Sequence, residues 1–104
     1  MRADATVFAA LGDETRLAMV ERLVRDGPLP VMRLGADAAM SRQAVTKHLH
    51  VLEKAGLVTR TRIGRESVWR LERRRLELAR QHLDDISRQW DHALERLRTH
   101  VETD

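Results

Sequence analysis

The sequence contains no cysteine among its 104 residues. This absence excludes disulfides, thiolate metal sites and cysteine nucleophiles together. No stretch approaches the roughly 20 consecutive apolar residues that span a bilayer. The apolar segment "TVFAALG", residues 6–12, is too short and too close to acidic residues to be a signal peptide. We therefore expect a cytoplasmic protein that has no membrane partner.

Signatures of catalysis are also missing. There is no G-x-S-x-G nucleophile elbow and no glycine-rich phosphate loop. Ser41 is expected to cap a helix and Ser67 to lie in a hairpin, so neither is a candidate nucleophile. No pair of buried carboxylates can be inferred. The sequence therefore indicates a protein that is not an enzyme.

The positive charge is concentrated in the middle of the chain. Residues 1–40 carry 5 Lys and Arg against 6 Asp and Glu, residues 41–75 carry 10 against 3, and residues 76–104 carry 4 against 7. A basic block between two acidic ones favours a polyanion bound at one place. The alternative is that these basic residues form a face that is only exposed to solvent. This alternative is less attractive because the block also carries a regular pattern of predicted helix and hairpin.

The first third predicts two helices and a weaker third one. A short helix carries Val7, Phe8 and Leu11, and a longer helix starts near Asp13, a suitable N-cap, and stops at residues 27–28. Its apolar stripe is expected to consist of Leu17, Val20 and Val24. A third helix is expected over residues 30–38, with Gly35 inside it and with Val31 and Leu34 packing inward.

The segment "MSRQAVTKHLHVLEKAGLV" predicts a fourth helix with two distinct faces. Ser41 can accept from the free amides at its N-terminus, and the helix runs to about Ala55 before Gly56. A short helix, a tight turn and this capped helix make a helix-turn-helix. The apolar face needs a core and is built from Val45, Leu49 and Leu52. The opposite face is crowded with polar side chains, namely Arg42, Gln43, Thr46, Lys47 and His50.

Residues 58–71 predict a β-hairpin. Gly64 at the first central position suits a type II′ turn with Arg65. This turn sets a register that pairs Val58 with Leu71, Arg60 with Trp69, Arg62 with Ser67, and Ile63 with Glu66. We interpret Trp69 as a ring at the edge of the core, covered by the stem of Arg60; base stacking is the alternative.

Residues 73–101 contain no Gly or Pro and predict one long helix. Its apolar residues step alternately by three and four, which is the spacing of a coiled-coil seam. The helix is longer than a domain of this size can cover, so the seam needs a partner. We therefore expect a homodimer whose interface is formed by the first and last helices, through Val7, Phe8, Leu11, Leu83, Ile86, Trp90, Leu94 and Leu97.

A helix-turn-helix followed by a basic hairpin is the arrangement that places a helix in the DNA major groove and a "wing" on the adjacent backbone. Arg, Lys and Gln side chains match the donors and acceptors of that groove. We expect the main role of Ser41 to be capping of the helix, and contact with phosphate to be its secondary role. The expected DNA-binding residues on the helix are Ser41, Arg42, Gln43, Thr46, Lys47 and His50, and those on the wing are Arg60, Arg62 and Arg65.

The stretches "LGDETRLAMVERL" and "MSRQAVTKHLHVLEKAGLVTRTRIGRESVWRL", together with the long final helix, resemble the ArsR/SmtB family of winged helix-turn-helix repressors. The resemblance covers essentially the whole chain, residues 1–104, as one domain. It implies a mainly α fold with five helices and a small β-hairpin. It also implies a homodimeric bacterial repressor that reads an inverted-repeat operator in double-stranded DNA. Many such proteins release DNA when a metal ion or another signal binds.

The metal-binding patterns of that family are not reproduced. Members that sense soft metals use cysteines near the third helix, and "LPVMRLGADA" has none. Members that sense zinc on the last helix have an acid two residues before a histidine. Here Arg80, Trp90 and Arg98 stand two residues before His82, His92 and His100. We therefore expect no metal and no cofactor, and the small-molecule effector is unknown.

Two other interpretations remain open. His82 with Asp85, or His92 with Glu95, has the spacing of helical metal ligands, which keeps a metal-responsive repressor as an alternative. A winged helix can also be a protein- or RNA-interaction module. Such a module has little reason to combine Arg42, Gln43 and Lys47 with an arginine-rich wing, so DNA is favoured.

Overall fold

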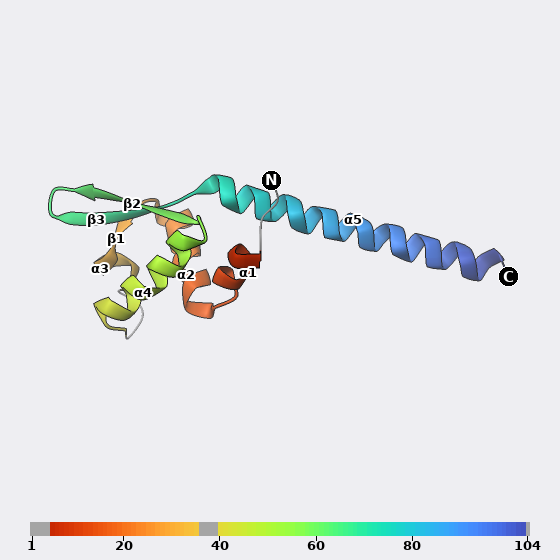
Figure 1. Ribbon diagram of the computed structural model, residues 1–104, viewed down its shortest axis with the longest axis horizontal. Helices are drawn as coiled ribbons and strands as arrows, with labels where there is room; N and C mark the ends of the chain where they lie inside the picture. Colours follow the sequence, from red (N-terminus) through yellow and green to blue (C-terminus); the bar gives the residue numbers. More distant parts are fainter. Residues whose placement is uncertain (1–4, 36–39, 104) are drawn as a thin grey trace.

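Five helices and three short strands follow one another in the computed structural model, which describes residues 5–35 and 40–103 (Figure 1). Their order confirms the predicted mainly α winged helix-turn-helix. The elements are α1 (Ala5–Leu11), α2 (Glu14–Asp26), β1 (Leu29–Pro30), α3 (Val31–Leu34), α4 (Arg42–Lys54), β2 (Val58–Ile63), β3 (Glu66–Leu71) and α5 (Arg73–Thr103).

Both predicted N-caps are present. The Asp13 carboxylate accepts from the backbone N–H of Arg16 at 3.0 Å, and the Ser41 hydroxyl accepts from the backbone N–H of Ala44 at 3.1 Å. Each bond satisfies one of the amides that a helix leaves unpaired in its first turn. The caps therefore fix where α2 and α4 begin.

The core lies where α2, α4 and the sheet meet. Its α4 side is the predicted one, because Val45, Leu49 and Leu52 are buried. On α2 the predicted stripe is correct for Val20, which is buried, and wrong for the other two residues, since Leu17 is 43% and Val24 is 61% exposed. The helix contacts α1, α4 and β3, and these neighbours enclose a different face. That buried face consists of Met19, Val20 and Leu23.

Gly35 ends α3 rather than lying inside it, so the predicted helix over residues 30–38 is too long. Val31 and Leu34 are buried as expected, and the N–H of Gly35 closes the short helix on the carbonyl of Val31 at 3.2 Å. A Cβ at Gly35 would stand 2.6 Å from Cγ2 of Val45. Glycine thus allows the end of α3 to approach α4. Residues 36–38 of the prediction lie outside the described residues.

The hairpin has the predicted register throughout, from Val58 opposite Leu71 to Ile63 opposite Glu66. Gly64 has a φ of +63°, and Arg65 does not have a positive φ, as a type II′ turn requires. The sequence analysis missed a third strand. β1 pairs with β3 on the edge away from β2, so the sheet order is β1-β3-β2.

Trp69 is a core residue rather than an edge residue, with 1% of its surface exposed. β3 is the central strand, and Trp69 stands opposite Leu29 on one side and opposite Arg60 on the other. Arg60 lies over the ring as predicted, but the observed contact is made by its guanidinium group, whose carbon is 5.6 Å from the ring centre. The burial of the ring removes the base-stacking alternative.

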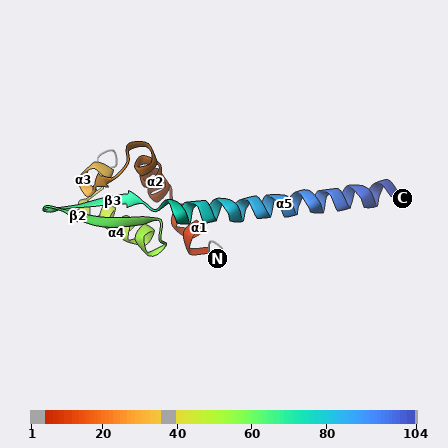
Figure 2. The ribbon, with the colours of Figure 1, turned by 90° about the horizontal axis from the view of Figure 1, so that it is seen from above.

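α5 leaves the body of the domain as a straight arm (Figures 1 and 2). Its start is fastened to the core, because Ala79 is buried there and Leu76 and Leu78 pack beside it. Phe8 of α1 meets the ring of His82 edge-on, with the ring centroids 5.7 Å apart. Beyond this contact α5 projects away from the domain. The whole molecule therefore measures 70 × 28 × 21 Å along its principal axes. None of the described helices is both long enough and apolar enough to cross a membrane.

Candidate nucleic-acid interface

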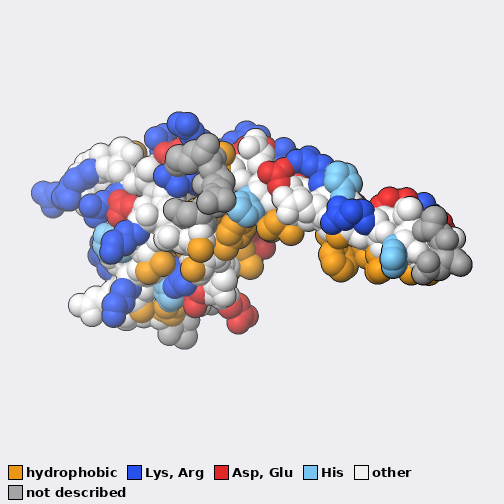
Figure 3. All heavy atoms as spheres, turned by 45° about the vertical axis from the view of Figure 1, so that its right-hand side comes forward, with side chains coloured by type: hydrophobic (Ala, Val, Ile, Leu, Met, Phe, Trp, Pro, Cys, Tyr) orange, Lys and Arg blue, Asp and Glu red, His pale blue; other side chains and the backbone are white. Residues whose placement is uncertain are grey.

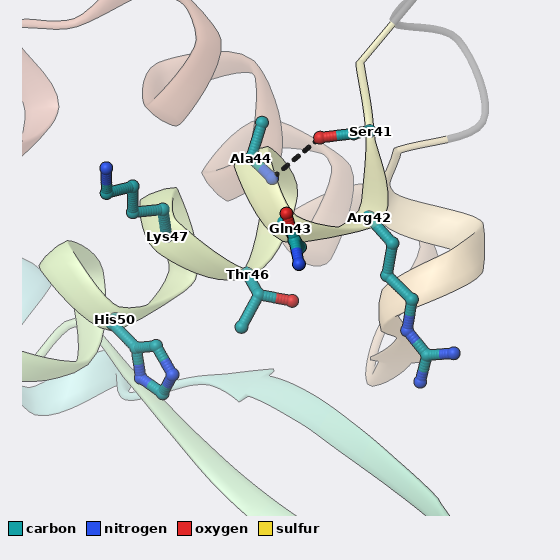
Figure 4. A pocket seen from close by; sticks show the side chains of 7 residues that line it. All are labelled: Ser41, Arg42, Gln43, Ala44, Thr46, Lys47 and His50. Carbon is teal, nitrogen blue, oxygen red and sulfur yellow. Dashed lines mark hydrogen bonds between the residues drawn. The ribbon is translucent and has the colours of Figure 1, made fainter.

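A groove of about 650 Å³ runs along the exposed side of α4 (Figure 4). The Ser41 cap fixes the start of the helix, and the buried face described above fixes its rotation. The polar side chains are therefore turned outward. All six of the predicted helix residues line the groove, together with Ala44: Ser41, Arg42, Gln43, Thr46, Lys47 and His50.

The six side chains are held in different ways. Ser41 uses its hydroxyl for the cap, whereas the side chains of Arg42, Gln43 and Lys47 make no hydrogen bond within the described residues. Arg42 and Thr46 point to one side of α4 and Lys47 points away to the other, so the set spans a broad surface (Figure 4). Long donors on both sides of one helix end can contact base edges and phosphates together.

His50 links the recognition face to the wing. Its Nδ1 lies 3.2 Å from Oε1 of Glu53, and its ring meets Trp69 edge-on with the centroids 5.9 Å apart. Because Trp69 is fixed in the core, these contacts hold His50 between α4 and β3. His50, one of the six expected DNA-binding residues of the helix, is thus restrained by contacts with Glu53 and Trp69.

The wing carries exposed arginines along both strands. Arg60, Arg62 and Arg65 are exposed as predicted, with Arg65 in the turn at the tip. Arg70, Arg73 and Arg74 are further exposed cations near the base of the wing. The motif alone did not select them, although the charge count over residues 41–75 contained their signal.

The cations differ in their partners according to where they lie. None of the ten Lys and Arg residues between positions 41 and 75 forms an ion pair with any residue that the structure describes. On α2 and on α5 beyond residue 76, by contrast, acids three or four residues away pair with Arg22, Arg80, Arg88 and Arg98. Blue side chains extend to the end of the molecule that carries the hairpin (Figure 3). Uncompensated charge on one region is the electrostatic footprint of a polyanion site.

Comparison with known proteins shows the family to which the chain belongs. A family model described as a helix-turn-helix domain matches residues 11–61. The HTH-type transcriptional regulator Rv2034 of Mycobacterium tuberculosis is 42% identical over 93 residues, which cover 89% of this chain and 83% of that protein. An ArsR-like transcriptional regulator from Rhodococcus sp. RHA1 has a TM-score of 0.79 at 36% identity, covering 91% of this chain and 89% of that one. The chain belongs to the ArsR family.

The ArsR-family fold also aligns with the transcriptional repressor BigR from Xylella fastidiosa. The TM-score is 0.61 at 26% identity, covering 74% of this chain and 79% of that one. Membership of the family makes this chain a DNA-binding transcriptional regulator of the winged helix-turn-helix type, not an enzyme. The matched segment includes all of α4, so the groove of Figure 4 lies on the helix-turn-helix itself.

The outer part of α5 carries an exposed apolar face in this ArsR-family chain. Hydrophobic side chains follow one side of the arm (Figure 3). They are between 44% and 64% exposed, and they are Leu83, Ile86, Trp90, Leu94, Leu97 and Val101. We call these six residues the α5 seam. Such a row of large apolar side chains is more than a monomer usually leaves in water.

Two of the three α1 residues expected beside the seam lie at the surface. Phe8 and Leu11 are half-buried and pack against the core from outside. Val7 is wrong as an interface residue, because it is 0% exposed and belongs to the core of its own chain. A helix of seven residues, Ala5–Leu11, must bury one face against the body of the domain, and Val7 is on that face.

The histidines of α5 do not gather with acids into a metal site in this structure. Among the described residues, no group of three His, Cys, Asp or Glu side chains could hold a metal ion. His82 instead contacts Phe8. Independence from metals stays a prediction.

Proposed function

We propose that this protein is a homodimeric repressor that binds an inverted-repeat operator and covers a promoter. It would act as a single domain in the cytoplasm, where bacterial DNA is found. The observation that carries the proposal is the separation of charges. The cations of α4 and the wing have no ion-pair partners among the described residues, whereas Arg22 and Arg25 of α2 and Arg80, Arg88 and Arg98 of the outer part of α5 do.

The roles of the DNA-facing residues follow from their positions. Arg42, Gln43 and Lys47 stand in the first turns of α4, the part of a recognition helix that approaches base edges most closely. Thr46 stands beside Lys47 among these base-reading residues, and His50 lies on the same groove further along the helix. The helix cap Ser41 and the three wing arginines, Arg60, Arg62 and Arg65, contact the backbone and set the register of the protein on the duplex.

The second subunit is a copy of this chain, packed on the α5 seam beside Phe8 and Leu11. A two-fold axis turns one recognition helix into a pair facing the same side of the duplex. The two half-sites would then be about one helical turn apart, roughly 34 to 36 Å. An inverted repeat matches this symmetry.

Repression rather than activation is supported by relatedness. BigR, to which the chain is similar over most of its length, is a transcriptional repressor. A DNA-binding dimer of this kind needs no further surface in order to exclude other proteins from the DNA that it covers.

Transcription in vitro tests this proposal. A binding site obtained from random duplex DNA is placed over the start of a strong promoter, and a scrambled site is placed in a matched template. We expect added protein to reduce transcripts from the first template and to leave the second unchanged. An increase from the first template would show an activator, and equal effects on both would show nonspecific binding.

A further inference from the structure

Arg16 of α2 contacts both α1 and α4, so its side chain connects three helices. It belongs to α2 and is half-buried, and its side chain reaches the end of α1. Its Nε donates to the carbonyl of Ala10 at 2.8 Å, and one terminal nitrogen donates to the carbonyl of Ala9 at 3.4 Å. The last carbonyls of a helix have no partner in the next turn, so the guanidinium satisfies the C-terminal end of α1.

The other terminal nitrogen of Arg16 points to the recognition helix. It lies 3.3 Å from Nδ1 of His48, a half-buried residue of α4. For this contact to be a hydrogen bond, Nδ1 must accept, which assigns the imidazole proton to Nε2. The guanidinium therefore has α1 on one side and α4 on the other.

Asp13 completes the cluster. Its Oδ2 accepts from the backbone N–H of Arg16 at 3.0 Å and lies 3.9 Å from Nδ1 of His48. The backbone hydrogen bond from Arg16, together with the positive charge of its guanidinium, lowers the pKa of Asp13 below its ordinary value. The carboxylate is thus kept charged between the N-terminus of α2 and the flank of α4.

We propose that Arg16 is a positioning residue for operator binding: by bridging the end of α1 to His48, it fixes the angle of the recognition helix relative to the dimer interface. This inference rests on the proposed homodimer, in which α1 lies beside the α5 seam. Apolar packing alone lets helices shift against each other, whereas a guanidinium with partners on two sides fixes both distance and direction. Arg16 itself lines neither the DNA-facing groove nor the wing.

A positioning residue makes a specific prediction about DNA. A single half-site needs only one α4, so its affinity should be insensitive to the angle between α4 and α1. A full operator needs two α4 helices at a fixed separation, so its affinity should depend on that angle. The loss on changing Arg16 should therefore appear on the full operator and in the preference for one spacing between half-sites.

The experiment measures Kd by fluorescence anisotropy on a half-site, on the full operator, and on operators whose spacer is longer or shorter by one base pair. The variants are Arg16→Lys, which keeps the charge but loses the fork, and the pair His48→Gln and His48→Leu, which keeps or removes the acceptor. Arg25→Gln is the matched control, because Arg25 is an exposed arginine of the same helix, whose side chain is 66% exposed.

We expect Arg16→Lys and His48→Leu to bind the full operator about tenfold more weakly and to lose most of the spacer preference. Both should stay within about twofold of the parent on the half-site, and His48→Gln and Arg25→Gln should match the parent on every DNA. Partial unfolding would weaken all DNAs by the same factor and leave the spacer preference unchanged.

The inference is overturned if Arg16→Lys and His48→Leu keep the spacer preference of the parent, whether or not their overall affinity falls. Should Arg16→Lys fail to fold, the comparison of His48→Leu with His48→Gln decides alone. A parent protein that itself binds half-site and full operator equally would instead overturn the homodimeric mechanism, and this inference with it. The behaviour of the parent therefore separates the two failures.

Discussion

Arginine serves three purposes in this regulator, and the surroundings of each side chain decide which. Arg16 is half-buried and bridges α1 and α4. On α5, Glu77 and Glu95 bind Arg80 and Arg98, each at 2.7 Å. Such exposed pairs contribute at most about 1 kcal/mol each, so their main effect is to neutralise charge along the arm. The arginines of the wing have no such partners within the described residues, and their charge remains available to phosphate.

Alanine substitutions should separate residues that read bases from those that position the protein. Gln43→Ala and Lys47→Ala should each cost about 1 to 3 kcal/mol on the best site and much less on random DNA, because base contacts exist only on the matching sequence. Arg65→Ala should weaken binding to both DNAs alike, because phosphates are the same everywhere. Anisotropy titrations on the two DNAs measure this, and Arg25→Ala is the control. Equal losses on both DNAs for the helix variants would refute the assignment.

The lowered pKa of Asp13 gives one residue a defined effect on acid stability. The charged carboxylate is favoured in the folded state, chiefly by the hydrogen bond from the Arg16 backbone. A group whose pKa is lowered on folding contributes stability above its ordinary pKa of 3.8, and this contribution is lost as the pH falls through the lowered value. The carboxylate should therefore stabilise the fold at neutral pH and not in strong acid.

Urea unfolding of the parent and of Asp13→Asn, at a series of pH values, tests this effect. The difference in the free energy of unfolding should be constant near neutral pH and should shrink as the pH falls below 3.8. Glu14→Gln, in the same helical turn, controls for the loss of a negative charge near the helix N-terminus. A difference that grows toward low pH would contradict the account.

At the scale of elements, local sequence signals predicted where α2 and α4 start and how the hairpin pairs. Features that depend on long-range contacts, namely β1 and the buried face of α2, were not predicted correctly. The caps Asp13 and Ser41 and the turn at Gly64 depend on neighbouring residues only, so the starts of α2 and α4 and the hairpin register were correct. β1 exists because Leu29 and Pro30 happen to pass beside β3, and two residues carry no periodicity from which to predict a strand. The buried face of α2 depends likewise on which elements surround it.

The candidate site divides in the same way. Exposed polar residues opposite an apolar stripe can be read from spacing, so the residues of the α4 groove and the wing arginines were found in advance. The Arg16 cluster was not, because it forms only when α1, α2 and α4 meet. Val7 was misplaced for a related reason: spacing shows that a residue is apolar but not which partner covers it.

The junction of α3 and α4 should not tolerate a side chain at Gly35. In Gly35→Ala the new methyl group would stand 2.6 Å from Cγ2 of Val45, so the two helices must separate. We expect a loss of about 1 to 3 kcal/mol in the free energy of unfolding, measured with urea. Combining Gly35→Ala with Val45→Ala should cost less than the sum of the two single changes, because the clash is then removed. If the losses in the free energy of unfolding of the two single variants simply add in the double variant, the cost of Gly35→Ala does not come from a clash with Val45.

At the scale of the whole molecule, the arm of α5 explains why a chain of this size should not act alone. The body of the domain covers α5 only near its start, at Leu76 and Ala79, while the α5 seam continues to Val101 (Figure 2). Apolar burial contributes about 25 cal/mol for each Å² removed from water, so a second copy on this seam is strongly favoured. In the proposed homodimer, the long helix therefore ties DNA recognition to dimerisation.

Placing charge in the seam should abolish operator binding without touching a DNA-facing residue. Leu83→Glu combined with Ile86→Glu puts four like charges into the dimer, at a cost of several kcal/mol. We expect this variant to sediment as a monomer or to unfold, and to lose the operator. Gln81→Glu with Thr99→Glu adds the same charge on the opposite side of α5 and should remain a dimer. A seam variant that is folded, monomeric and as tight as the parent on the full operator would reject the dimer mechanism.

The most direct test of the central claim is selection of binding sites from random duplex DNA with the purified protein. A homodimeric reader should enrich an inverted repeat whose half-sites are about one helical turn apart, and each selected duplex should bind two chains. Enrichment of a single half-site, or of no sequence at all, would contradict the claim that two copies of α4 read one operator.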